Sequence, residues 1–223
     1  MRRIKHKYIQ QDLVFDRGSF VNLVIENPRF FREFLTGLKT QIEDKEAFVT
    51  YTIDGKESDL SKDVCIIYSP FLAVNDEKKD SLIIQKAVSS SLSDEQRSRL
   101  NDLLNDIQSF VKEATTDYPL TLEIDSEITP TQFFKSFSLR PFIQDDEFVN
   151  YFISELKQTS VVQKKSLFIF VSATDYLDED EIEIIFKELR ALDCDLLVLS
   201  GHIFKTISKS ERRIIVDYDL CEL

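Results

Sequence analysis

Residues that could perform catalysis form no recognisable catalytic arrangement in this sequence. His6 and His202 are the two histidines, and neither has a nucleophile at a spacing typical of a catalytic triad. Asp175, Asp178 and Asp180 are close enough to suggest carboxylate-held magnesium ions, as in a metal-dependent nuclease. Their positions around a predicted first helical turn fit capping and compensation of the helix dipole better. The sequence therefore predicts no catalytic residues.

A nucleotide site would require a glycine-rich loop between a strand and a helix, with a lysine for the phosphates and a Ser or Thr for magnesium. The first strand-to-helix junction reads Glu26-Asn27-Pro28, in which proline lacks an amide donor and glutamate repels phosphate. A later buried strand ends in Val171-Ser172, without an aspartate to hold magnesium through water. The four glycines are Gly18, Gly37, Gly55 and Gly201. We therefore expect a chain that neither binds nor hydrolyses ATP.

Cysteine usage and the length of the apolar runs favour a cytoplasmic protein. Cys65, Cys194 and Cys221 are far apart and form no CxxC pair, which predicts reduced thiols rather than a disulfide or a metal site. No apolar run approaches the roughly 20 residues that span a bilayer, and nothing near Met1 resembles a signal peptide.

The net charge of −12 argues against a uniformly basic nucleic-acid-binding protein. It leaves open a concentration of basic groups on one surface, with the acidic groups elsewhere. The first nine residues carry four such groups: Arg2, Arg3, Lys5 and Lys7. This pattern fits an edge strand with a charged outer face, and a basic arm that contacts phosphate is the alternative.

The elements that would position these residues are clearest near the end of the chain. Residues 167–171 form an uninterrupted apolar run, which predicts a strand buried on both faces. Asp178 with Glu181 predicts a capped helix, and residues 196–199 predict a second buried strand. A strand, a helix and a strand with short connections form a right-handed βαβ unit, which predicts a mainly parallel sheet.

Other elements of the same α/β head are predicted at both ends of the chain. A helix begins at Pro28 with Asn27 as its cap, and Asp54-Gly55 marks a turn. Further strands are predicted at residues 20–25, 48–53, 64–68 and 213–216.

Residues 76–163 contain no glycine and read as almost wholly helical. Ser93 with Gln96 predicts a capping box at the start of a long amphipathic helix. Its apolar residues form a narrow seam suited to packing against another helix: Leu100, Leu103, Leu104, Ile107, Phe110, Val111 and Ala114. Two more helices are predicted at residues 131–139 and 147–156. We therefore predict a helical subdomain, residues 76–163, inserted into an α/β head formed by residues 1–75 and 164–223.

Five segments spread over nearly the whole chain carry a resemblance to a known family. They read RGSFVNLVIEN, DKEAFVTYTIDGKESDLSKDVCIIYSPF, LEIDSEITPTQFFKS, KKSLFIFVSATDYLDEDEIEII and RRIIVDYDL. In this order they resemble the small CRISPR-associated adaptation protein of type II-A systems, the form that assembles into a ring around double-stranded DNA. None of the segments is a catalytic signature, so the resemblance rests on their shared order.

The resemblance implies an α/β head related to P-loop NTPases, with a degenerate nucleotide site, and a helical leg. It implies a ring-shaped homotetramer without enzymatic activity, which binds duplex DNA nonspecifically and preferentially from free ends. It also implies support of spacer acquisition in antiviral defence, alongside the CRISPR spacer integrase and the effector nuclease. Calcium stabilises the ring in members of the family.

The acidic stretch at residues 122–129 matches the part of the family that carries calcium ligands. The resemblance therefore implies Glu123, Asp125 and Glu127 as the metal-binding residues. Hard carboxylate oxygens at alternate positions suit calcium, which takes six to eight oxygen ligands. Considered without the family, the same residues also fit the solvated face of a strand or a helix cap.

Binding to a DNA backbone requires lysine and arginine side chains that reach phosphate, and it weakens steeply with salt. Each basic residue of this chain taken singly also fits a solvated surface position, but some subset is expected to line the DNA channel. Scattered lysines do not read base edges, so the binding is expected to be nonspecific. The candidates are Lys78, Lys79, Lys86, Arg97, Arg99, Lys135, Lys164 and Lys165.

Two functions of other classes remain open from the sequence. One is a metal-dependent nuclease or NTPase. The other is a scaffold that binds only the proteins of the adaptation complex, through its acidic outer surface.

Overall fold

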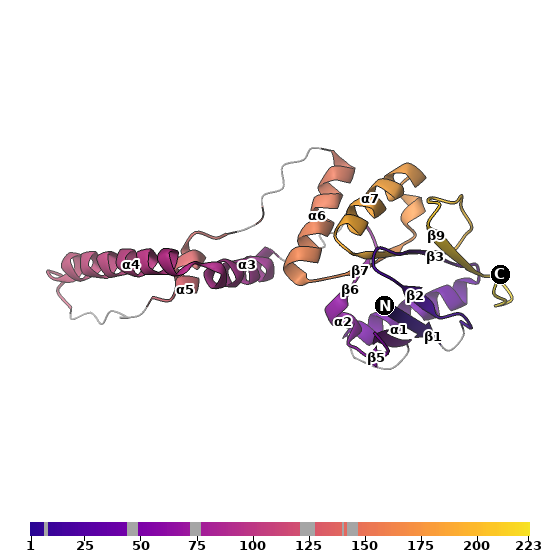
Figure 1. Cartoon of the computed structure of the whole chain (residues 1–223), viewed down its shortest axis with the longest axis horizontal. Coiled ribbons are helices and arrows are strands. Elements are labelled where there is room, and N and C mark those ends of the chain that lie inside the picture. The colour runs from indigo at the N-terminus through magenta and orange to yellow at the C-terminus, as the bar shows by residue number, and fades with distance from the viewer. Residues whose placement is uncertain (7–8, 44–48, 72–76, 121–127, 140, 142–146) are drawn as a thin grey trace. The chain divides into compact units, whose positions relative to one another are not determined.

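The computed structural model describes the chain except at residues 7–8, 44–48, 72–76, 121–127, 140 and 142–146 (Figure 1). Its contacts divide the chain into two compact units. The α/β unit comprises Met1–Asn75 and Ile143–Leu223, and the helical unit comprises Asp76–Phe142. The predicted boundary at residue 163 therefore needs correction, because residues 143–163 group with the α/β unit.

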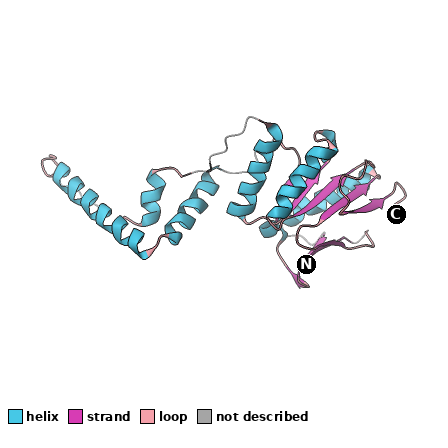
Figure 2. Ribbon diagram, turned by 45° about the horizontal axis from the view of Figure 1, so that its top comes forward, coloured by secondary structure: helices cyan, strands magenta, loops and turns pink. Residues whose placement is uncertain are grey.

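A five-stranded parallel sheet forms the centre of the α/β unit (Figure 2). Its order is β6-β7-β8-β3-β9, and every neighbouring pair is parallel. The strands are β3 (Phe20–Ile25), β6 (Val64–Ile67), β7 (Leu167–Val171), β8 (Asp195–Ser200) and β9 (Glu211–Val216). All side chains of β3, β7 and β8 are buried, as expected for strands covered on both faces. The predicted parallel sheet is confirmed.

A second, antiparallel sheet was not predicted. Its order is β2-β1-β4-β5, formed by β1 (Arg2–His6), β2 (Leu13–Phe15), β4 (Val49–Ile53) and β5 (Lys56–Glu57). The prediction of an edge strand at the start of the chain was wrong, because β1 lies between β2 and β4. Asp54 and Gly55, both at positive φ, form the predicted turn between β4 and β5.

Different elements cover the two faces of the parallel sheet. On one face, α1 (Pro28–Glu43), α2 (Leu60–Asp63) and the inner face of the antiparallel sheet share one core. On the other face, α6 (Phe148–Gln163) and α7 (Glu179–Ala191) pack against the sheet (Figure 2). Phe152 and Leu156 of α6 are fully buried in that second core, beside Phe168 and Phe170 of β7. This burial explains why α6 belongs to the α/β unit.

The helical unit contains α3 (Glu77–Ser91), α4 (Asp94–Thr115) and α5 (Pro130–Ser136), as predicted for this part of the chain. Two hydrogen-bonded pairs run along α3 and α5: Ser81 with the Leu139 carbonyl at 2.7 Å, and Ser89 with Thr131 at 3.4 Å. Since the later residue of α3 meets the earlier residue of α5, these two helices are antiparallel. No helix among the described residues is long and apolar enough to cross a membrane.

Local capping signals set the helix starts. Ser93 with Gln96 forms the predicted capping box of α4, and Asp178 with Glu181 forms that of α7. A further box, Thr129 with Gln132, starts α5, with Pro130 in its first turn. Each box satisfies amides that the helix itself leaves unpaired.

Candidate nucleic-acid interface

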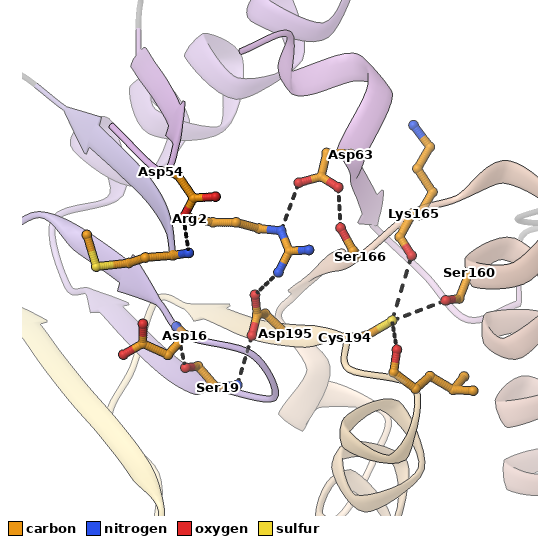
Figure 3. Close-up of polar contacts among 12 residues, drawn as sticks. Arg2, Asp16, Ser19, Asp54, Asp63, Ser160, Lys165, Ser166, Cys194 and Asp195 are labelled. Atoms are coloured by element: carbon orange, nitrogen blue, oxygen red, sulfur yellow. Dashed lines mark hydrogen bonds and ion pairs between the residues drawn. The ribbon is translucent and has the colours of Figure 1, made fainter. Parts of the chain in front are cut away.

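A buried ionic cluster joins the two sheets of the α/β unit (Figure 3). Arg2 of β1 donates from Nε to Asp63 at 2.9 Å and from Nη1 to Asp195 at 2.7 Å. Asp63 also accepts hydrogen bonds from the hydroxyls of Tyr51 and Ser166. Asp63 and Asp195 lie at the amino ends of parallel strands, whereas α/β sheets bind their ligands at the carboxyl ends. We therefore assign this cluster to stability.

Burial and opposite charge set the pKa values in this cluster. Burial lowers the pKa of Arg2, but the charges of Asp63 and Asp195 outweigh it, so the net shift is upward. Burial raises the pKa of Asp195, and the Ser19 amide at 2.8 Å and the Arg2 guanidinium partly offset that rise. Arg2 is thus the counter-charge that makes an ionised, fully buried Asp195 tolerable.

At the carboxyl end of β3, the start of α1 is occupied by its own cap. Asn27 Oδ1 accepts hydrogen bonds from the amides of Arg29 at 3.0 Å and Phe30 at 3.2 Å. Its Nδ2 donates to the carbonyl of Tyr218 at 2.9 Å. In a phosphate loop, amides at this point of the fold would bind phosphate. Here the Asn27 side chain already accepts hydrogen bonds from two of these amides.

Two residues that were considered as catalytic candidates from the sequence, Asp178 and His6, make contacts that stabilise the fold. Asp178 accepts a hydrogen bond from the Glu181 amide at 2.8 Å, which is the predicted capping role. His6 is buried, and its ring lies 5.5 Å from that of Phe30 and 5.2 Å from that of Phe34. An aromatic cage of this kind indicates a core histidine.

None of the three cysteines is in a disulfide. Burial raises the pKa of Cys65 to about 11, although the charge of Lys165 opposes the shift. Burial also raises the pKa of Cys194, which a hydrogen bond with Ser160 partly offsets. Both thiols therefore stay protonated at neutral pH, and a protonated thiol is a poor nucleophile.

Six of the eight predicted phosphate contacts lie in the helical unit, and all six are exposed. They are Lys78, Lys79 and Lys86 on α3, Arg97 and Arg99 on α4, and Lys135 on α5. Lys79 and Lys86 are seven residues apart and so share one face of α3. Arg97 and Arg99 are two residues apart, about 200° around the helix, so they lie on different sides of α4.

The antiparallel packing of α3 and α5 brings another lysine level with the middle of α3. The hydrogen bonds at the two ends of the pair place Lys135 level with Gln85, one residue from Lys86. Lys79, Lys86 and Lys135 are therefore predicted contacts on two helices that pack together, and we call them the α3–α5 lysines.

Lys164 and Lys165 belong to the α/β unit. Lys164 is exposed and ends α6 in the left-handed conformation, with φ of 58°. Lys165 is half-buried, and its Nζ donates to the carbonyl of Ser61. Lys165 is thus committed to a contact within the protein and is the weaker candidate of the two.

The apolar seam predicted on α4 is largely exposed. Leu100 and Leu104 are buried, but Leu103, Ile107 and Phe110 are 48%, 42% and 69% exposed. Leu100, Leu103, Ile107 and Phe110 follow steps of three and four, the heptad spacing of helices that pack along a seam. Such a face is suited to a partner helix.

Comparison with known families identifies the chain. The model of the family Cas_Csn2, described as a CRISPR-associated protein, matches residues 41–220. The chain belongs to the Cas_Csn2 family. The predicted membership of a type II-A CRISPR-associated family is confirmed, and with it a role in CRISPR adaptation.

Other comparisons add little to the family assignment. The curated protein sequences contain no match. Among solved structures, the chain is similar to a bacterial Atm1-family ABC exporter with ATP bound, at 14% identity and a TM-score of 0.42. The similarity covers 97% of this chain, which spans 37% of the exporter chain. A likeness at this level carries no argument, so the predicted relation to P-loop NTPases stays a prediction.

The calcium ligands predicted for this Cas_Csn2 protein, Glu123, Asp125 and Glu127, lie outside the described residues. Within the described ranges, no group of three or more His, Cys, Asp or Glu side chains could hold a metal ion. Gln132, which follows the acidic stretch, has its Oε1 taken by the Thr129 amide at 2.7 Å. Its oxygen therefore serves the cap of α5.

The role of Arg2 was missed from the sequence, although one signal could have indicated it. Side chains alternate between the two faces of a strand, so Arg2 shares a face with Ile4 and His6, both of which are buried. An arginine on the apolar face of a strand predicts a buried counter-ion. The acids that fill this role are 61 and 193 residues away, which no local pattern reveals.

The ionic cluster predicts a pH-dependent stability defect for Arg2→Met. Removing one partner of a buried ion pair costs about 3–5 kcal/mol in the free energy of unfolding at neutral pH. When folding raises the pKa of an acid, the ionised acid destabilises the folded state at pH values above its folded-state pKa. This destabilisation disappears as the pH falls toward the unfolded-state pKa. Loss of Arg2 raises the pKa of Asp195 further, so the defect should shrink between neutral pH and about pH 5.

Urea unfolding at the two pH values measures this defect. Arg3→Met is the matched control, since Arg3 pairs with Asp12 at the surface and its loss should cost about 1 kcal/mol or less. A defect in Arg2→Met that equals the control, or that does not change with pH, would contradict the assignment.

Proposed function

We propose that this Cas_Csn2 protein supports CRISPR spacer acquisition in the cytoplasm by binding double-stranded DNA without catalysis and without reading its sequence. In this proposal four copies form a ring that DNA enters preferentially from free ends, alongside the spacer integrase and the effector nuclease. Family membership carries the adaptation role. The observation that best supports DNA binding is the group of exposed α3–α5 lysines on two adjacent helices.

Several contacts support a non-catalytic, nonspecific mode. The Asn27 cap occupies amides that phosphate binding at α1 would use, and Asp178 is engaged in capping α7. Lysines act as point charges on phosphate and carry no base-edge pattern. The proposed binding is therefore dominated by the backbone charge of DNA and depends on salt.

The exposed seam of α4 supports association with a second copy of this chain. Leu103, Ile107 and Phe110 leave apolar surface in water that another helix of the same kind would bury. Identical seams can pair about a two-fold axis, which is the usual way that identical subunits assemble. The helical unit thus offers one contact of the proposed ring.

The first prediction of the proposed function concerns the α3–α5 lysines. Changing Lys79, Lys86 and Lys135 together to Gln should weaken binding to a linear duplex by at least about tenfold near 0.1 M salt. The slope of log affinity against log salt should fall by about 1 for each lysine that contacts phosphate. Mobility-shift titrations over a salt series measure both quantities, and the duplex should be recovered intact after incubation with magnesium.

A control variant removes the same charge from another surface. Lys62, Lys205 and Lys209 are exposed residues of the α/β unit that are not among the predicted contacts. Their joint change to Gln should leave most of the affinity and the salt slope in place. If both triple variants behave alike, the α3–α5 lysines are not the interface. Cleavage of the duplex would overturn the non-catalytic proposal.

The second prediction concerns the α4 seam. Ile107→Asp with Phe110→Asp should reduce the solution mass of the assembly, because charges on the seam would be desolvated at the contact. Asn105→Asp with Ser109→Asp places the same charges on the opposite face of α4 and should leave the mass unchanged. Light scattering after gel filtration decides the matter, with circular dichroism to verify helix content. Equal masses for both variants would exclude this seam from the assembly.

The third prediction concerns calcium, which Glu123, Asp125 and Glu127 would bind through carboxylate oxygens. Chelation should lower the melting temperature of the wild type, and the variant with all three changed to their amides should melt alike with and without calcium. Glu113→Gln with Asp117→Asn, which changes nearby acids on the described part of the helical unit, should keep the response. If chelation leaves the melting temperature of the wild-type protein unchanged, calcium has no part in the proposed function.

A further inference from the structure

The solvent-facing side of the antiparallel sheet carries a hollow of about 240 Å³. Alternation along β1 buries Ile4 and turns Arg3 and Lys5 to the outer face. On the neighbouring strand β4, Thr50 and Thr52 lie on the same outer face, and all four polar residues line the hollow. The remaining lining comes from Met1, Asp12 and Gly55.

The register of the two strands sets the spacing of these four side chains. Arg3 is directly opposite Thr52, and Lys5 is directly opposite Thr50. Directly opposed residues of antiparallel strands have Cβ atoms about 5 Å apart, and residues two apart along a strand are separated by about 7 Å. Two cations and two hydroxyls therefore surround an area about the size of one phosphate group.

The lining of the hollow keeps a net positive charge, because Arg3, Lys5 and the amino group of Met1 outnumber Asp12. Met1 also pairs with Asp54, and Glu57 of β5 lies opposite Thr52 on the same face. Asp12 lies 3.1 Å from Nη1 of Arg3, which leaves most of the five N–H donors of that guanidinium for another acceptor. Among the described residues, Lys5 forms no ion pair and is exposed. A hydroxyl can donate to an anionic oxygen, so all four groups favour the same kind of ligand.

We propose that this hollow, formed by Arg3, Lys5, Thr50 and Thr52, binds a phosphate group of the nucleic-acid backbone. The inference rests on the proposed DNA binding. It adds two hydroxyls and a defined place in the sheet to Arg3 and Lys5, which the sequence offered only within an alternative basic arm. Lysine, arginine and threonine are typical donors to backbone phosphates. Lys5 and Thr50 are exposed, so a phosphate that is part of a long polymer can reach the hollow.

Removing the two cations tests the charge contribution. Arg3→Gln with Lys5→Gln should weaken binding to a linear duplex by about fivefold or more near 0.1 M salt and lower the salt slope by about 1 to 2. Lys205→Gln with Lys209→Gln removes the same charge from an exposed loop of the same unit and should change neither value appreciably. If the two double variants match in affinity and slope, the proposal fails.

Removing the two hydroxyls tests the hydrogen bonds separately from the charge. Thr50→Val with Thr52→Val keeps the β-branched shape that strands favour, so the sheet should form normally. Loss of two neutral donors should weaken duplex binding by about fivefold while the salt slope stays at its wild-type value. Unchanged affinity would show that the hydroxyls do not contact phosphate.

Inorganic phosphate separates the failure of this inference from the failure of DNA binding. In a two-dimensional NMR titration at low salt, phosphate should shift the amide signals of β1 and β4 in the wild type but not in Arg3→Gln with Lys5→Gln. If the wild-type protein binds inorganic phosphate in the hollow but does not bind duplex DNA, the proposed function is contradicted and the hollow is a site for free phosphate. If the wild-type protein binds duplex DNA but neither ligand shifts the amide signals of β1 and β4, only the proposal for the hollow is overturned.

Discussion

One guanidinium group holds the two sheets of the α/β unit in a fixed relation. Arg2 belongs to the antiparallel sheet, whereas Asp63 and Asp195 precede or begin strands of the parallel sheet. Neither carboxylate can lose its partner without leaving a charge unpaired at low dielectric. We infer that this cluster selects one register of β1, and a strand register decides which side chains face outward. With Arg2 turned inward, Arg3 and Lys5 must face solvent.

The elements predicted correctly from the sequence are those whose signals are local. The caps at Asn27, Ser93 and Asp178 are each satisfied within three residues, so the sequence contains the whole interaction. The buried strands of the parallel sheet were also predictable, because a strand covered on both faces is apolar over most of its length. The antiparallel sheet was missed because β1 pairs with β4 about fifty residues later, and pairing of distant segments leaves no short-range pattern.

The boundary of the helical unit and the grouping of the candidate site residues also depend on contacts between distant segments, which a local sequence pattern does not reveal. Phe152 and Leu156 have the helical spacing of an apolar stripe, but that spacing does not say whether the stripe meets another helix or a sheet. The exposed lysines of α3 and α5 could be listed from the sequence, but their grouping required the antiparallel packing of two helices. Conversely, the contact of Lys165 with the Ser61 carbonyl, which makes it the weaker candidate of its pair, could not be predicted from the sequence.

A chain with a net charge of −12 can bind a polyanion only if distance separates its acids from the contact. At physiological salt, exposed charges farther apart than about 8–10 Å are largely screened, so a phosphate responds to the few side chains around it. Residues 76–142 contain 12 acidic and 8 basic residues, yet the α3–α5 lysines occupy two adjacent helices. The same screening isolates Arg3 and Lys5 from most acids of the α/β unit. At low salt the screening weakens, and the acids then oppose the approach of DNA over long distances while the direct contacts strengthen. The measured salt slope of this protein is therefore expected to be shallower than the number of its phosphate contacts alone would give.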